Sequence, residues 1–207
     1  MTPVIAQDVF ARIAALGGGT RRFIAVTGPP GSGKSTYADA LCAALIAQGL
    51  RAAVLPMDGY HYDNAILDQR GWRDRKGAPH TFDVAALEQD LQRLRHADRS
   101  LFVPVFDRAQ DLSRAFGREI PPDCDIIVVE GNYLLLDVAP WHALRGLFDL
   151  TLFCAVADAV VIERLTVRWR SYGLSEAEAT KKVFENDLLN AALIDHHSVP
   201  ADLTIET

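Results

Sequence analysis

The run GPPGSGKST, which begins at Gly28, constrains this chain more than any other stretch. Its glycines, lysine and serine fit the spacing G-x-x-x-x-G-K-[ST], in which backbone N–H groups of a glycine-rich turn surround phosphate oxygens. The run follows the apolar, β-branched segment 22–28 and precedes apolar residues at helical spacing. We therefore predict a strand, a phosphate-binding loop and a helix whose positive N-terminal end faces the phosphates.

This loop predicts ATP and Mg²⁺ as cofactors. We expect Lys34 to reach the β- and γ-phosphates and the hydroxyl of Ser35 to ligate Mg²⁺. The predicted nucleotide contacts are Gly28, Pro29, Pro30, Gly31, Ser32, Gly33, Lys34, Ser35 and Thr36. Glu130 ends the apolar run DIIVVE, and a carboxylate at the carboxyl edge of a parallel sheet indicates a second Mg²⁺ ligand.

Apolar runs of strand length alternate with helical periodicity along the chain. The predicted strands are 22–28, 51–58, 101–107, 125–131, 148–156 and 201–206, and the helices include 3–16, 158–171 and 175–192. Residues 59–83 lack periodicity, so we predict a long functional loop there. This order is typical of an α/β, three-layer P-loop NTPase fold, with a mainly parallel sheet flanked by helices. We expect a single P-loop domain over 1–207 with a small helical lid at about 157–192.

Composition and charge exclude several classes of protein. The 21 Lys and Arg against 27 Asp and Glu give a net charge of -6 without a long basic run, which argues against nucleic acid. Cys42, Cys124 and Cys154 are far apart, so we predict small buried side chains in a reducing compartment. The N-terminus lacks the pattern of a signal peptide, and no apolar run is long enough for a membrane span. We therefore predict a cytoplasmic protein with a small-molecule substrate and no membrane partner, and a homodimer as one option.

Asp58 in the segment PMDGYHYDN is the predicted partner of the phosphate acceptor. It ends the second predicted strand and should therefore stand beside the phosphate loop. Phosphoryl transfer to an alcohol needs a carboxylate that orients the hydroxyl and accepts its proton. Tyr60, His61 and Tyr62 offer hydrogen bonds and stacking faces to a substrate, although His61 equally suits an ordinary loop histidine.

Two pairs of side chains on the C-terminal helices are further candidates. Arg164 and Arg168 are four residues apart, so they share a helix face and could close over the transferring phosphate. The alternative is a solvated basic face. Asn186 and Asn190 also share a face, as contacts of nucleotide or substrate or as helix-surface amides.

Together, GPPGSGKST, PMDGYHYDN, RKGAPHTFD and IIVVEGNYLLL resemble the superfamily of phosphoribulokinase, uridine kinase and bacterial pantothenate kinase. The resemblance covers about residues 22–205 and is nearest to bacterial kinases labelled as fructose-transport-system kinases. It implies a nucleotide role for Gly28–Thr36, a base role for Asp58 and an Mg²⁺ role for Glu130.

The chain departs from this pattern where the acceptor should bind. Pantothenate kinases carry a Tyr-Ser-His signature where this chain has PVFDRAQD, and uridine kinases carry FDHP where it has KGAPHTFD. We predict that Asp107 and Arg108 help to select the acceptor, and that their strand ends at the same sheet edge as Asp58. An Asp-Arg pair suits a hydroxyl-rich or anionic acceptor.

The label of the nearest subgroup implies a sugar such as fructose as the first expectation for the acceptor, followed by a nucleoside and then pantothenate. The rival from another class is an NTP-binding regulatory module without kinase activity. Such a switch needs no acceptor base, so Asp58 distinguishes the two.

Overall fold

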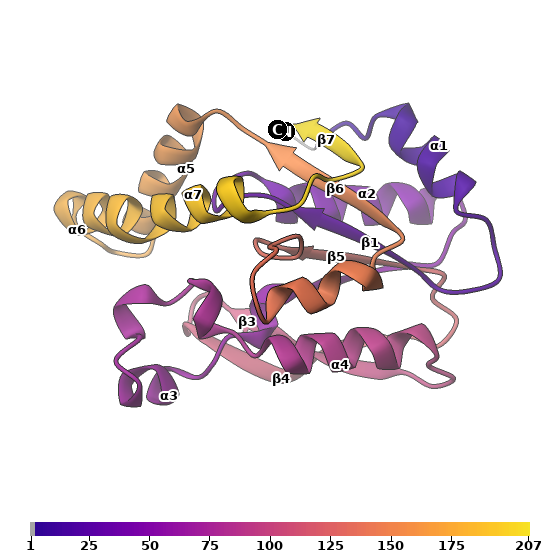
Figure 1. The fold of residues 1–207 in the computed structure, drawn as a ribbon, viewed down its shortest axis with the longest axis horizontal. Helices are drawn as coiled ribbons and strands as arrows, with labels where there is room; N and C mark the ends of the chain where they lie inside the picture. Colours follow the sequence, from indigo (N-terminus) through magenta and orange to yellow (C-terminus); the bar gives the residue numbers. More distant parts are fainter. Residues whose placement is uncertain (1–2) are drawn as a thin grey trace.

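A parallel sheet forms the centre of the computed structural model, which describes residues 3–207 (Figure 1). Its five strands have the order β2-β5-β1-β6-β7, and every neighbouring pair is parallel. The strands are β1 (Arg22–Thr27), β2 (Ala52–Pro56), β5 (Ile126–Gly131), β6 (Leu150–Ala155) and β7 (Leu203–Glu206). β5 lies between β2 and β1 and is buried at every position, as its apolar run predicts.

Helices cover both faces of this sheet, which confirms the predicted three-layer architecture. One face carries α1 (Gln7–Ala15) and α2 (Lys34–Ala47), and the other carries α4 (Val84–Arg95) and the 3₁₀ segment η4 (Trp141–Leu147). Successive strand residues point to opposite faces. Ile24 and Val26 of β1 therefore pack in the core with α2, and Phe23 and Ala25 pack in the core with α4.

The C-terminal helices form a smaller group beside the sheet. They are α5 (Asp158–Ser171), α6 (Glu176–Lys182), the π-helical turn η5 (Val183–Asp187) and α7 (Leu188–His197). Val161, Leu165 and Val183 make a small core of their own. Ser175 begins α6 with a capping box that includes Glu178. The two predicted helices are confirmed, except that η5 interrupts the second.

Residues 59–83 contain more structure than the predicted loop. The segment holds η1 (Met57–Tyr60), α3 (Asn64–Gln69), η2 (Arg73–Arg75) and η3 (Pro79–Thr81). Asp63 starts α3 by accepting a hydrogen bond from the Ala65 N–H. These helices are too short to show a 3.6-residue apolar period in the sequence.

The strand prediction for 101–107 is correct, but its predicted sheet is wrong. β3 (Leu101–Asp107) pairs antiparallel with β4 (Leu112–Ile120) in a separate two-stranded sheet. The sequence did not reveal β4, because most of its residues are polar or exposed. The hairpin packs against η1, so its tip still approaches the segment that carries Asp58.

Cys42, Cys124 and Cys154 are free and buried, as predicted. Over the described part of the chain, no helix combines the length and the apolar character that a membrane crossing requires.

Candidate active site

Residues 28–33 form the turn between β1 and α2. Gly33 occupies the N-cap position of α2 with a φ of 84°, a left-handed conformation that side chains disfavour. No side chain caps this helix, so its first N–H groups remain available to an external acceptor. The turn and the helix N-terminus together form an anion-binding geometry.

Two polar side chains of this loop have few partners within the protein. The Ser32 hydroxyl is buried and has no hydrogen-bond partner among residues 3–207. Within the described residues the Lys34 ammonium makes one hydrogen bond, to the carbonyl oxygen of Pro29 at 3.5 Å. Burial lowers the pKa of Lys34, while the nearby carboxylates of Glu130 and Asp58 act in the opposite direction. Phosphate oxygens would satisfy both groups, so the loop fits a nucleotide.

Ser35, at the start of α2, contacts Glu130 in β5. The Ser35 hydroxyl donates to Glu130 Oε2 at 3.0 Å. Burial, and then the charge of Asp58, raise the pKa of Glu130. Residues 3–207 contain no cluster of three or more His, Cys, Asp or Glu that could hold a metal ion. Mg²⁺ needs only one or two carboxylates when substrate phosphates complete its shell, so this oxygen pair fits it.

Asp58 lies in η1, directly after β2, and forms an ion pair with the hairpin. Arg108 Nη2 donates to Asp58 Oδ2 at 2.6 Å. Burial acts to raise the pKa of Asp58, but Arg108, His61 and Lys34 outweigh it and leave this pKa below its usual range. The carboxylate is therefore ionised and lies within electrostatic range of the phosphate loop.

A glycine beside Asp58 allows this approach of the hairpin. A Cβ at Gly59 would lie 2.3 Å from the carbonyl oxygen of Pro104 in β3. Any side chain at this position would therefore push β3 away from η1. The close packing brings the hairpin tip, and Arg108 with it, to the carboxylate.

Comparisons with known proteins match this geometry. A solved structure from Silicibacter sp. TM1040, described as a candidate fructose transport system kinase, has a TM-score of 0.91 and 39% sequence identity. The match covers 98% of this chain and 100% of that one. A candidate uridine kinase of Schizosaccharomyces pombe is 34% identical over 200 residues, which is 90% of this chain and 83% of that protein. This chain belongs to the P-loop kinases.

Two weaker matches describe parts of this kinase. A pantothenate kinase of Parvibaculum lavamentivorans is 31% identical over 167 residues, which is 72% of this chain but 50% of that enzyme. A family model described as the methylmalonyl-CoA mutase-associated GTPase MeaB matches residues 2–65. That range holds the phosphate loop but not β5 or the C-terminal helices. Proteins named as kinases match nearly the full length of this chain, and the protein is an ATP-dependent phosphotransferase.

In this P-loop kinase, Asp107 and Arg108 point to different places. Asp107 Oδ1 accepts the backbone N–H groups of Ala109 and Gln110, each at 3.1 Å. Its other oxygen lies 3.4 Å from Arg114 Nε. Asp107 therefore shapes the hairpin turn, while Arg108 extends to Asp58.

The three aromatic residues after Asp58 also differ in position. Tyr60 is 4% exposed and donates its hydroxyl to Asp90 Oδ2 at 2.9 Å, so its side chain belongs to the core. His61 Nδ1 lies 2.8 Å from the carbonyl oxygen of Asp58, and its ring stacks on Phe82 at a centroid distance of 3.9 Å. Tyr62 is partly exposed beneath the guanidinium of Arg70.

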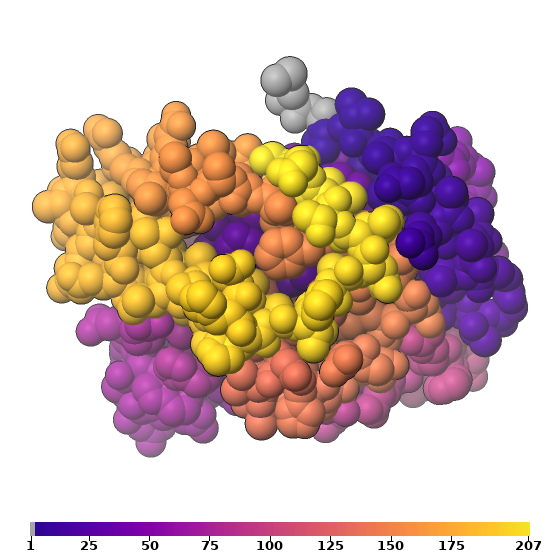
Figure 2. Space-filling view, turned by 45° about the horizontal axis from the view of Figure 1, so that its top comes forward, coloured from indigo at the N-terminus to yellow at the C-terminus, as the bar shows by residue number. Residues whose placement is uncertain are grey.

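The arginines of α5 approach the phosphate loop. Arg164 Nη1 lies 3.4 Å from the carbonyl oxygen of Gly31. Arg168 is close enough to lower the pKa of Lys34. Figure 2 shows a hollow bordered by orange and yellow C-terminal segments, with indigo and violet N-terminal atoms at its floor. The C-terminal helices therefore surround an opening to the segment that carries the loop.

Asn186 and Asn190 are buried, so the prediction of helix-surface amides is wrong for this structure. Asn186 donates to the carbonyl oxygen of Lys76 at 3.1 Å, and Asn190 accepts from Arg75 at 3.2 Å. These contacts tie η5 and α7 to the basic run RGWRDRKG. The sequence marked this run as basic, but its partners are more than a hundred residues away.

Lys76 extends the same network to the hairpin. Its ammonium donates to Asn64 Oδ1 at 2.7 Å and to the carbonyl oxygen of Asp111 at 2.6 Å. It also pairs with the Asp111 carboxylate at 2.9 Å. One partly buried lysine thus joins the α3 segment and the hairpin tip, while its own backbone carbonyl accepts from Asn186.

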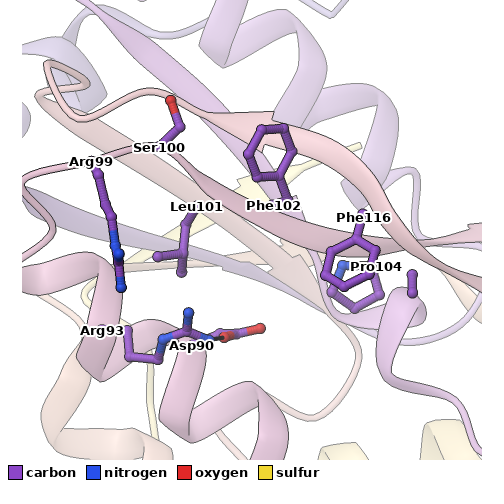
Figure 3. Close-up of a pocket in the computed structure, with 9 residues that line it drawn as sticks. Asp90, Arg93, Arg99, Ser100, Leu101, Phe102, Pro104 and Phe116 are labelled. Atoms are coloured by element: carbon purple, nitrogen blue, oxygen red, sulfur yellow. Dashed lines mark hydrogen bonds and ion pairs between the residues drawn. The ribbon is translucent and has the colours of Figure 1, made fainter.

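A second hollow of about 480 Å³ lies between α4 and the outer face of the β3–β4 hairpin (Figure 3). Asp90, Arg93 and Phe116 are among its lining residues. None of the residues predicted for the active site lines it. This hollow is therefore separate from the phosphate loop.

Proposed function

We propose that this P-loop kinase transfers the γ-phosphate of ATP to an alcohol group of a small, hydroxyl-rich metabolite, with a sugar such as fructose as the first acceptor class. The observation that carries the proposal is the ionised carboxylate of Asp58 beside the phosphate loop. A kinase acting on an alcohol needs such a group in line with the transferred phosphate.

The proposed step uses groups from both sides of the site. The alcohol oxygen bonds to the γ-phosphorus as the bond from phosphorus to the ADP oxygen breaks, and Asp58 accepts the alcohol proton. Lys34 meets the charge on the phosphates, and Arg164 and Arg168 approach it from α5, in the role of a lid. Bound Mg²⁺ would be held by Ser35 and Glu130 and would neutralise phosphate charge.

Asp58 and the paired Arg108 support a hydroxyl-rich acceptor, because both form hydrogen bonds with hydroxyl groups. The name of the Silicibacter protein supports a sugar, whereas the names of other relatives support a nucleoside or pantothenate. A regulatory NTPase is a weaker alternative, since it would not need a carboxylate at Asp58.

A panel assay tests this function. ADP release with ATP and Mg²⁺ would be measured against sugars, nucleosides and pantothenate, for the wild type and for Asp58→Asn. We expect one class to accelerate ADP release and Asp58→Asn to abolish that acceleration. Equal acceptor-stimulated turnover in the two proteins would reject Asp58 as the base.

A further inference from the structure

The carboxylate proposed as the base is already engaged by a guanidinium. Arg108 Nη2 lies 2.6 Å from Asp58 Oδ2, and among residues 3–207 this is the hydrogen bond that the Asp58 carboxylate accepts. The Arg108 side chain is 47% exposed and that of Asp58 is 21% exposed. Solvent therefore reaches the pair, and a small molecule could reach it as well.

This ion pair opposes the function of a base. A carboxylate that accepts a charge-assisted hydrogen bond at this distance is a weaker proton acceptor. The guanidinium also occupies a position where an acceptor hydroxyl would donate to Oδ2. Before Asp58 can accept a proton from an alcohol, Arg108 has to exchange this contact for another.

The chemistry of the exchange favours an anion. If the guanidinium leaves the carboxylate of Asp58 for a neutral hydroxyl, it loses the attraction between opposite charges, so a neutral hydroxyl replaces that carboxylate poorly. A carboxylate or phosphate group matches the planar guanidinium in two parallel hydrogen bonds. Arg108 uses only Nη2 toward Asp58, which leaves donors for such a group.

The backbone at Arg108 is held in place, so only the side chain has to move when Arg108 exchanges Asp58 for another partner. Asp107 binds the N–H groups of the turn, and Lys76 holds the hairpin tip through Asp111. The long, half-exposed side chain of Arg108 contacts the Asp58 carboxylate and lies over the ring of Phe106, 5.9 Å from its centroid, and it makes no hydrogen bond to the hairpin. It can rotate without disturbing the hairpin.

We propose that Arg108 is an exchangeable counter-ion, which holds Asp58 until the acceptor presents a carboxylate or phosphate group of its own. The acceptor is then an alcohol that bears an anionic group, and the exchange leaves Asp58 to take the proton of its hydroxyl. Without an acceptor, the pair suppresses transfer of the γ-phosphate to water. This inference rests on the proposed role of Asp58, and it replaces a neutral sugar such as fructose by a hydroxyl-rich acceptor that bears a carboxylate or phosphate group.

Acceptor-free ATP hydrolysis tests the suppression. In Arg108→Met we expect hydrolysis to rise on the order of tenfold, because Asp58 can then orient a water and accept its proton. Arg114→Met is the matched control, since Arg114 lies on the same hairpin but pairs with Asp107, and it should leave the rate unchanged. Arg108→Lys, which keeps the charge, should stay near the wild-type rate.

The double variant Asp58→Asn/Arg108→Met shows whether the effect acts through Asp58. We expect the added hydrolysis to disappear in it. The proposal is overturned if Arg108→Met does not raise hydrolysis, or if the rise persists in the double variant.

Matched acceptors test the anionic group. One set is glucose, gluconate and glucose 6-phosphate, and the other is ribose, ribonate and ribose 5-phosphate. Each set compares a neutral sugar with a carboxylate and a phosphate on the same carbon framework. We expect an anionic member to exceed its neutral parent at least about tenfold in kcat/KM, and Arg108→Met to remove that advantage. The assignment would be overturned if a neutral acceptor equals or exceeds its anionic counterparts in kcat/KM, or if Arg108→Met retains the advantage of the anionic acceptor. Absence of turnover with every acceptor would also overturn it. Failure of the proposed function is distinguishable, because Asp58→Asn would then leave turnover of the best acceptor unchanged.

Discussion

The two sides of the active site are built in different ways. On the nucleotide side, Lys34 and Ser35 begin α2, which follows β1 through the phosphate loop, and Glu130 lies in β5, the strand that pairs with β1. On the acceptor side, Asp58 and Arg108 come from η1 and a separate hairpin, and side chains such as Lys76 hold these pieces together.

This difference indicates how one scaffold can serve several acceptors. Changing the nucleotide side disturbs the parallel sheet, because its residues lie in or beside buried strands. The hairpin and residues 59–83 can change while the sheet stays intact. Relatives named for uridine and for pantothenate accordingly match the chain.

The largest expected effect lies on the nucleotide side. Lys34→Met removes the ammonium that meets phosphate charge, so we expect kcat to fall about 10³-fold or more in the panel assay. Lys181→Met, which changes an exposed lysine of α6, is the control. A variant that folds normally and retains more than a tenth of the wild-type kcat would contradict the role of Lys34.

Asp58→Asn should separate the two sides. The change keeps the shape of the side chain but removes its charge, and we expect kcat to fall about 10²–10⁴-fold. The affinity for ATP with Mg²⁺, measured by calorimetry, should change little. Asp39→Asn on the exposed face of α2 is the control. An equal loss of nucleotide affinity would make Asp58 a metal ligand instead.

Asp107→Ala should have a smaller effect that is confined to the acceptor. The change removes the carboxylate oxygen that accepts hydrogen bonds from the turn N–H groups, so the backbone of Arg108 would no longer be held in position. We expect kcat/KM for the acceptor to drop about tenfold, with KM for ATP nearly unchanged. An unchanged acceptor kcat/KM would leave Asp107 with a structural role only.

Tyr60→Phe should affect stability and not turnover. It removes a buried hydroxyl that donates to Asp90, so we expect the free energy of unfolding to fall by about 1 kcal/mol. Urea unfolding measures this change, and acceptor kcat/KM should stay within about twofold. A tenfold loss of kcat/KM without a loss of stability would assign Tyr60 to the acceptor instead of the core.

The nucleotide side was predictable because its signals are local. The apolar run 22–28, the glycine-rich turn and the following helical period are contiguous, and the observed β1 ends one residue before the predicted strand, with α2 following the turn as predicted. Glu130 was predictable from the single run that ends in it. Each signal spans fewer than twenty residues.

On the acceptor side, the sequence predicted which residues take part but not the contacts between them. Asp58 and Arg108 were both predicted, but their ion pair joins positions 50 residues apart, and no local pattern encodes it. Arg75 and Asn190 are separated by 115 residues. β4 was missed because its exposed, polar residues lack the apolar alternation of a half-buried strand.

Because Cys154 is buried, its reactivity can report local opening of the sheet in this kinase. Burial raises the pKa of that thiol to about 12, so the reactive thiolate is nearly absent at neutral pH. Cys154 lies on β6, and a Cβ at Gly28 would touch its backbone. An alkylating reagent can modify it only in molecules whose sheet has opened there, so the labelling rate counts those openings. Comparing the labelling rate of Cys154 with and without nucleotide would measure in solution how much nucleotide binding at the loop reduces opening of the sheet.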